Sequence, residues 1–206
     1  MTKTPTHESF TEFEAAFAHF NAELFSNKLP QCLITLHRHK SARGYFWAEK
    51  FERSSGERVV DEIAMNPDCF KGRTDTETLS TLVHEMVHLQ QKHFGKPSRN
   101  GYHNKEWAGM MDMVGLTPST TAAPGGKRTG QNCSHYIVTG GPFSVACAKL
   151  IKTGFVITWR SRPKAPIAGK SGKRIKYECD ECGAAAWGKE GLNIECGDCG
   201  ITMAEL

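Results

Sequence analysis

The pentapeptide His84-Glu85-Met86-Val87-His88 constrains this chain more than any other feature of its sequence. It lies in a stretch with helical apolar spacing, so the two histidines, four positions apart, project from one helix face and can bind one Zn²⁺. Glu85 stands beside the first histidine, where a carboxylate can take a proton from a zinc-bound water. The alternative is an ordinary amphipathic helix that carries two surface or core histidines.

The flanking residues favour the zinc interpretation because they delimit a complete helix. Thr74 and Glu77 have the spacing of a capping box, and Gly95 followed by Pro97 is typical of a helix end. A helix of about 75–94 is therefore predicted to carry the motif.

A catalytic zinc site requires a third protein ligand and one open position. His93 cannot be that ligand, because nine residues of helix place it on the face opposite His84. His103 is the better candidate, since it follows a chain reversal at 95–101 and precedes a second helical pattern. Glu106, one turn further, is the fallback.

Together with Gly101-Tyr102-His103-Asn104-Lys105-Glu106-Trp107, the motif resembles the SprT-like family of zinc metalloproteases, which includes the Spartan-type proteases of DNA–protein crosslinks. Residues 21–30 are similar to the first helix of that family and its exit, and 62–67 to the strand before its active-site helix. The C-terminal cysteines are similar to its zinc ribbon. The resemblance covers roughly 10–117 and 177–200, and departs at Asn104, where the family usually has glycine.

This resemblance implies an α+β, zincin-like fold: a helix, a small antiparallel sheet, the HExxH helix and a further helix, followed by a small β zinc ribbon. The expected domains are a protease domain at 9–118, a basic intermediate segment and linker at 119–176, and the ribbon at 177–206. It also implies a catalytic zinc on His84, His88 and His103, with Glu85 activating water.

The region before the motif reads as one helix and three strands. Ser9 with Glu12 predicts a capped helix at 9–26 with a phenylalanine stripe facing the core. Strands are expected at 31–40, 43–53 and 58–65, and their short connections suggest an antiparallel meander. The family comparison implies that 43–53 rims the cleft and pairs with an extended substrate.

Other histidines offer weaker possibilities. His37 and His39 share one strand face and can bind metal, although alternate polar positions usually face solvent. The stretch 119–132 is a loop or linker, and strand character returns over 135–160, including 143–145 and 155–159. His135 or Tyr136 can reach the active site as a proton donor or oxyanion stabiliser, or can simply pack.

Two Cys-x-x-Cys pairs, each followed by glycine, predict a closed structural zinc site near the C-terminus. The ligands are Cys179, Cys182, Cys196 and Cys199, so two zinc ions are expected per chain. Trp187 lies between the pairs as either the minimal core of the ribbon, which we favour, or a platform for stacking an unpaired base. The remaining cysteines are scattered, as expected for reduced thiols in a cytosolic protein.

The net charge of +4 conceals a strong segregation, because residues 113–177 hold eleven basic side chains and no acidic one. Such a stretch suggests a polyanionic partner, here DNA and preferably single-stranded DNA, although basic linkers are common. The expected nucleic-acid contacts are Arg160, Arg162, Lys164, Lys173 and Arg174. No secretory signal or apolar span is present, so a cytoplasmic, DNA-associated protein is expected.

Three functions fit these observations. The first is a zinc endopeptidase that hydrolyses proteins bound or crosslinked to DNA. The second is a non-catalytic, nucleic-acid-binding zinc protein with a relic peptidase fold, and the third is a housekeeping metalloprotease without a DNA link. The presence of Glu85 favours an enzyme, because a relic has no need of that carboxylate.

Overall fold

The computed structural model describes residues 4–99, 101–162 and 174–206. The chain forms two compact units, Met1–Pro163 and Lys164–Leu206, and each is described by itself. The first unit is longer than the protease domain expected at 9–118. Among the described residues, no helix combines the length and apolarity needed to cross a membrane.

Helix α1 (Pro5–Phe25) begins earlier than the predicted 9–26. Thr4 is its N-cap and Pro5 occupies the first turn, where the missing N–H costs nothing. Ser9 therefore lies inside the helix and is buried. The phenylalanine stripe is confirmed for Phe13, Phe17 and Phe20, which are all buried in the core, but its first predicted member, Phe10, is exposed.

The first sheet has the strand order β1-β3-β2, so the predicted antiparallel meander is wrong in part. Strands β2 (Gly44–Glu52) and β3 (Val59–Met65) form the expected antiparallel pair, but β1 (Leu33–Leu36) runs parallel to β3. The loop between β1 and β2 separates these two strands, and β3 lies between them and pairs with both. Asn66 holds this loop by donating two hydrogen bonds from Nδ2, to His39 O at 2.8 Å and Ala42 O at 2.7 Å.

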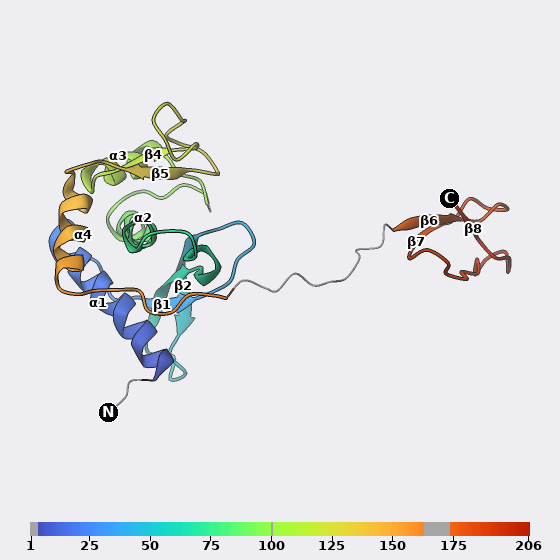
Figure 1. Cartoon of the computed structure of the whole chain (residues 1–206), viewed down its shortest axis with the longest axis horizontal. Helices are drawn as coiled ribbons and strands as arrows, with labels where there is room; N and C mark the ends of the chain where they lie inside the picture. The colour runs from blue at the N-terminus through green and yellow to red at the C-terminus, as the bar shows by residue number, and fades with distance from the viewer. Residues whose placement is uncertain (1–3, 100, 163–173) are drawn as a thin grey trace. The chain divides into compact units, whose positions relative to one another are not determined.

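Helix α2 (Asp75–Phe94) lies at the centre of the first unit, between the sheet on one side and helix α3 (Lys105–Met113) on the other (Figure 1). Its predicted bounds are confirmed, and both hydrogen bonds of the Thr74–Glu77 capping box are present. Strand β2 approaches α2 closely at Gly44. A Cβ there would lie 3.0 Å from the Thr81 methyl group and 3.3 Å from Glu85 Oε1, so only glycine fits this approach without displacement.

The chain beyond α3 forms a two-stranded sheet and a fourth helix. Strands β4 (Leu116–Ser119) and β5 (Ser134–Ile137) are antiparallel neighbours, and α4 (Pro142–Lys152) follows. The predicted strand at 143–145 is wrong. Phe143, Ala146, Cys147 and Leu150 have the spacing of one helix face, Pro142 suits a first helical turn, and all four apolar residues are buried in the core.

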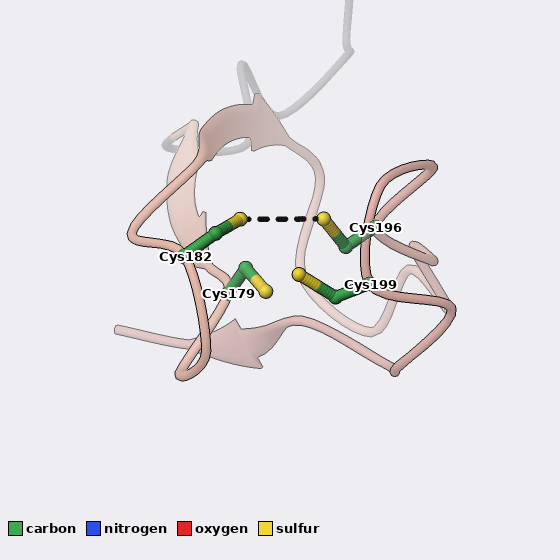
Figure 2. Close-up of side chains that lie close together, drawn as sticks. All are labelled: Cys179, Cys182, Cys196 and Cys199. Carbon is green, nitrogen blue, oxygen red and sulfur yellow. Dashed lines mark hydrogen bonds between the residues drawn. The ribbon is translucent and has the colours of Figure 1, made fainter.

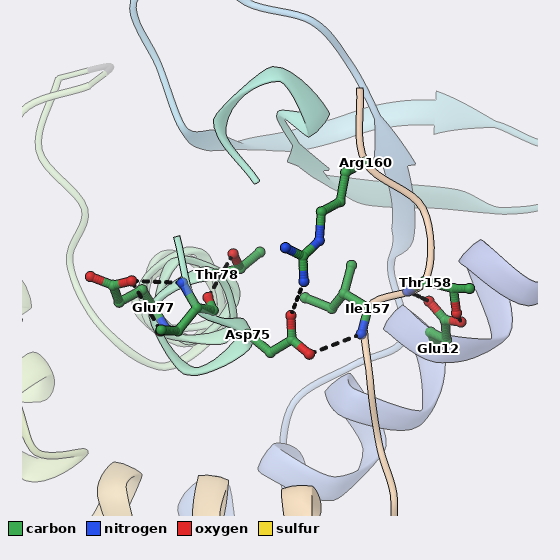
Figure 3. Close-up of polar contacts among 8 residues, drawn as sticks. Glu12, Asp75, Glu77, Thr78, Ile157, Thr158 and Arg160 are labelled. Atoms are coloured by element: carbon green, nitrogen blue, oxygen red, sulfur yellow. Dashed lines mark hydrogen bonds and ion pairs between the residues drawn. The ribbon is translucent and has the colours of Figure 1, made fainter. Parts of the chain in front are cut away.

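Residues 155–160, near the end of the described part of the first unit, form no strand, contrary to prediction. Carboxylates of α1 and α2 hold them instead (Figure 3). Ile157 N donates to Asp75 Oδ2 at 3.2 Å, and Thr158 N donates to Glu12 Oε2 at 3.0 Å. Asp75 also pairs with Arg160 at 3.0 Å. This segment is therefore part of the folded unit.

The second unit contains three short strands, β6 (Ile175–Glu178), β7 (Ala185–Gly188) and β8 (Ala204–Glu205), in the order β7-β6-β8. Its core comprises Tyr177, Cys179, Cys196 and Met203. Trp187 is 62% exposed, so the favoured interpretation of this residue as the core is wrong. Tyr177 takes that role, and its hydroxyl donates to Lys189 O at 2.6 Å.

The packing of 155–160 yields a stability prediction with a matched control. Ile157→Ala should lower the free energy of unfolding by about 2 to 4 kcal/mol, because its side chain is only 2% exposed. The neighbouring Val156 is 52% exposed, and Val156→Ala should change stability by less than about 0.5 kcal/mol. Urea unfolding of both variants measures the difference. Equal, small effects would mean that the segment is a linker and does not pack.

Candidate metal centres and catalytic groove

Three histidines come together at the centre of the first unit. His84 and His88 project from α2, and His103 lies immediately before α3. One possible ligand atom from each lies within 4.8 Å of the other two. Three imidazoles that converge in this way are the donor set of a catalytic zinc site, and they leave a fourth position for water or substrate.

A chain reversal brings His103 back to α2. Gly101 has φ +71°, a conformation that favours glycine, and a Cβ there would lie 2.5 Å from Gln131 Nε2. His103 then forms an isolated bridge with Gly130, with backbone distances of 2.9 and 3.0 Å in the two directions. The His103 ring donates a further hydrogen bond from Nδ1 to Gly130 O at 3.0 Å, which leaves Nε2 free to bind metal.

Asn104, the departure from the family pattern, has a clear structural role. Its backbone is extended, so glycine is not required, and its side chain caps α3 by accepting from Trp107 N at 2.9 Å. Glu106, the fallback ligand, does not join the histidine cluster. Its carboxylate accepts from Gln91 Nε2 and from Lys96 N, both at 2.7 Å. These contacts fasten the reversal to the end of α2.

Trp107 supports the three histidines from one side. Its ring centroid lies 4.9, 5.0 and 4.3 Å from those of His84, His88 and His103. The sequence indicated only that this residue belongs to an apolar helical pattern. Its position at the metal centre depends on the angle between α2 and α3, which no local pattern encodes.

Burial sets the protonation of the site. It lowers the pKa of His84 well below its usual range and that of His88 to about 3, so both rings are neutral and can donate a lone pair to metal. Burial likewise raises the pKa of the Glu85 carboxyl to about 8. Without a bound cation, this burial favours the neutral carboxyl form of Glu85 near pH 7, and a strongly shifted pKa beside the histidines is typical of a group that exchanges protons.

His135 reaches the site from β5. Its Nδ1 lies 3.0 Å from His84 Nδ1, and its Nε2 lies 2.9 Å from Ser80 Oγ. Burial, together with the positive charges of Arg73 and Arg43, lowers the pKa of His135 to about 4. Tyr136, the next residue on the strand, projects to the opposite face. Of the two residues considered from sequence, His135 is thus the one at the metal centre.

A groove of about 1230 Å³ runs past these residues. Residues of β2 line one side, Glu85 lies on α2 at the base, and residues 97–99, 101–103 and 131–135 line the other side. The strand order leaves β2 at the edge of its sheet, as the expected substrate-binding strand must be.

The remaining candidate histidines have other partners. His37 and His39 line the groove but do not join the histidine cluster, and His39 Nδ1 accepts from Ser41 N and Ala42 N in a turn. His93 pairs with Asp61 of β3 at 2.7 Å, on the other side of α2 from the metal centre. That position agrees with its exclusion as a ligand.

The second unit holds the four cysteines around one point, with their sulfur atoms within 4.8 Å of one another (Figure 2). The two knuckles have the same backbone geometry. Gly183 N donates to Cys179 O and Gly200 N donates to Cys196 O, each at 2.8 Å, and both glycines have positive φ. Two equivalent turns therefore aim four sulfur atoms at a shared centre.

The sulfur spacing fits zinc. Cys182 Sγ and Cys196 Sγ lie 3.6 Å apart, and sulfur atoms bound to one tetrahedral zinc are separated by about 3.8 Å. Four cysteine ligands occupy every position of such an ion, so this site suits a structural role. The arrangement matches the predicted ribbon.

The basic residues expected to bind DNA have different surroundings. Arg160 pairs with Asp75, whereas Arg162 and Arg174 are exposed, and Lys164 and Lys173 lie outside the described residues. Three further basic residues of 113–177 pair with carboxylates elsewhere in the sequence. These pairs are Arg128–Asp112, Lys149–Glu23 and Lys176–Glu178. Intramolecular pairing thus accounts for part of the charge segregation.

An HExxH helix, a third histidine delivered by a reversal and a groove along an edge strand define a metallopeptidase-like site. The SprT-like family model matches residues 13–125, more than half of the 206 residues, and the chain belongs to this family. It is also 46% identical over 59 residues to the "Uncharacterized protein in mucB 3'region" of Salmonella typhimurium, a match that covers 29% of this chain and 80% of that protein. No solved structure matches the chain.

The histidine cluster and the cysteine cluster together predict a zinc stoichiometry that can be measured. The purified chain should contain two zinc ions, and His103→Ala should lose one of them because two imidazoles hold zinc weakly. The control is His93→Ala, which removes a histidine in the last turn of α2 that lies outside the cluster. This variant should retain both zinc ions. Elemental analysis after dialysis measures the stoichiometry. Full zinc content in His103→Ala would exclude His103 as a ligand.

Proposed function

We propose that this protein is a zinc-dependent endopeptidase that cleaves proteins bound or crosslinked to DNA. The observation that carries the proposal is the position of Glu85, buried beside His84, His88 and His103 on the floor of an open groove. A carboxylate next to three convergent imidazoles is costly to bury, and peptide hydrolysis explains why it is placed there.

Different residues of this chain would perform substrate binding and proton transfer. The edge of β2 would bind the substrate backbone in extended form, and Gly44 lets that edge lie close to Glu85. Glu85 would accept a proton from the attacking water at its carboxylate and return it to the leaving nitrogen. Zinc, when bound to the three histidines, would favour the ionised form of Glu85, lower the pKa of the water and polarise the scissile carbonyl.

Binding through the main chain gives broad specificity, because every peptide bond offers the same donors and acceptors. A protease that removes unrelated proteins from DNA needs such breadth. The groove agrees with this requirement, since exposed main chain on the edge strand forms one of its walls.

Two features support DNA as the partner. The first is a basic run in the sequence, Arg162, Lys164, Lys173 and Arg174, of which the two described residues, Arg162 and Arg174, are exposed, whereas Arg160 pairs with Asp75. The second feature is Trp187, whose exposed indole on β7 lies opposite Lys176 of β6 and can stack on an unpaired base. Stacking requires an unpaired base, so single-stranded DNA is the proposed form.

Glu85→Gln tests the catalytic part of the proposal. The substitution keeps the size of the side chain and leaves the three histidines intact, but it removes the proton acceptor. Zinc content should stay at two ions, while cleavage of an unfolded protein substrate should fall by about 100-fold or more. A variant with substantial remaining activity would show that another residue activates the water. An inactive wild-type chain with full zinc would support the non-catalytic alternative.

The DNA link is tested by reversing charges on the basic run. Replacing Arg162, Lys164, Lys173 and Arg174 with Glu should weaken single-stranded DNA binding and flatten its salt dependence, by about 0.7 in log–log slope per lost phosphate contact. Arg160 is left intact because it pairs with Asp75. Cleavage of a DNA-bound protein should fall, whereas cleavage of a free peptide should persist.

The control variant carries the same change in net charge at exposed lysines elsewhere. These are Lys28, Lys71, Lys105 and Lys152. Fluorescence anisotropy across a salt series measures both variants. Equal binding by the two variants would mean that the basic run is only a linker, and it would favour a housekeeping protease.

A further inference from the structure

Two of the three histidine ligands are held by a segment that lies beyond the matched family region, 13–125. His103 donates from Nδ1 to Gly130 O, and His84 Nδ1 lies 3.0 Å from His135 Nδ1. Both partners belong to the stretch 130–135, at the start of β5. The sequence suggested only that His135 or Tyr136 of this stretch can reach the active site, and it assigned no role to Gly130.

The contacts of His135 form a continuous chain of hydrogen bonds. Ser80 Oγ lies 2.8 Å from Glu77 O, to which it can only donate, because a carbonyl oxygen has no hydrogen. The Ser80 hydroxyl then accepts from His135 Nε2 at 2.9 Å. A neutral histidine carries one ring proton, so a protonated Nε2 leaves Nδ1 of His135 as an acceptor.

This direction determines the tautomer of His84. His84 must donate from Nδ1 to His135 Nδ1, and its own Nε2 is then left with a free lone pair. The reverse direction would place the proton on His84 Nε2 and block metal binding there. Only the order His84 to His135 to Ser80 to Glu77 O both satisfies the hydrogen bonds and leaves His84 ready to bind metal.

We propose that His135 is a positioning residue of the metal centre, which fixes the ring and tautomer of His84 through its contact with Ser80. The inference deepens the proposed function, because it rests on the same three-histidine site. It explains why a polar ring, and no aliphatic side chain, occupies this position of β5 against α2. It also makes 130–135 an integral part of the centre, since Gly130 performs the corresponding task for His103.

Three substitutions separate this role from simple packing. Asn places its carbonyl oxygen at the same number of bonds from Cα as histidine Nδ1, so His135→Asn keeps an acceptor for His84. His135→Gln instead places a donor at the position of Nε2, which keeps the Ser80 contact and loses the acceptor. His135→Phe keeps the ring size and loses both contacts.

Zinc affinity is measured on the full chain by competition with a chelator. Cobalt substitution distinguishes the histidine site from the thiolate site. His135→Phe and His135→Gln should bind zinc at the histidine site about 10 to 100-fold more weakly, and His135→Asn should remain close to wild type. The ribbon site should be unchanged in all three variants. Thermal unfolding of the metal-free chains reports any loss of packing.

Unchanged affinity in all three variants would overturn the inference. So would an equal loss in all three that follows the loss of thermal stability, because that pattern indicates packing alone. If the variants do not fold, long-range ¹H–¹⁵N correlation spectra of the wild-type chain decide the question: a proton on His84 Nδ1 supports the proposal, and one on Nε2 overturns it. Tight zinc binding without proteolysis would refute the proposed function and leave this inference standing.

Discussion

The return of His103 to helix α2 is the constraint on which the rest of this structure depends. Two histidines on one helix make an incomplete site, and the third arrives only because the chain reverses sharply after Phe94. Gln91 and Glu106 fasten that reversal to the helix, and Asn104 caps the helix that follows it. A network of side-chain hydrogen bonds therefore converts a helical motif into a three-ligand centre.

Helix caps and the spacing of neighbouring residues were sufficient to predict those parts of the two sites that lie within one short stretch of sequence. The bounds of α2 follow from a capping box and a terminal glycine, and the cysteine ligands follow from spacing within two knuckles. The order of strands was predicted less well, because the position of β3 between β1 and β2 depends on a loop held by Asn66. Helix α4 was missed since aromatic and β-branched residues resemble a strand unless their three- and four-residue spacing is given more weight.

The contacts that support the ligands were not predicted from the sequence. His135 was one of two candidates for the active site and Trp107 was part of an apolar helical pattern, but their contacts with the histidines join distant parts of the chain. The charge pattern was misleading for a related reason. Residues 113–177 have no acidic side chain of their own, but carboxylates such as Asp75 and Glu23 reach them from other elements. A charge run in sequence is thus not necessarily a free charged surface in the fold.

We propose above all that His84, His88 and His103 hold a zinc ion with one open position beside Glu85. A crystal structure of the full chain, with anomalous diffraction recorded on both sides of the zinc absorption edge, tests it most directly. We expect two zinc peaks, one bound by four sulfur atoms and one by three imidazole Nε2 atoms and a single water. A lone peak at the cysteines, or a histidine-bound zinc whose fourth ligand is His135, would contradict it.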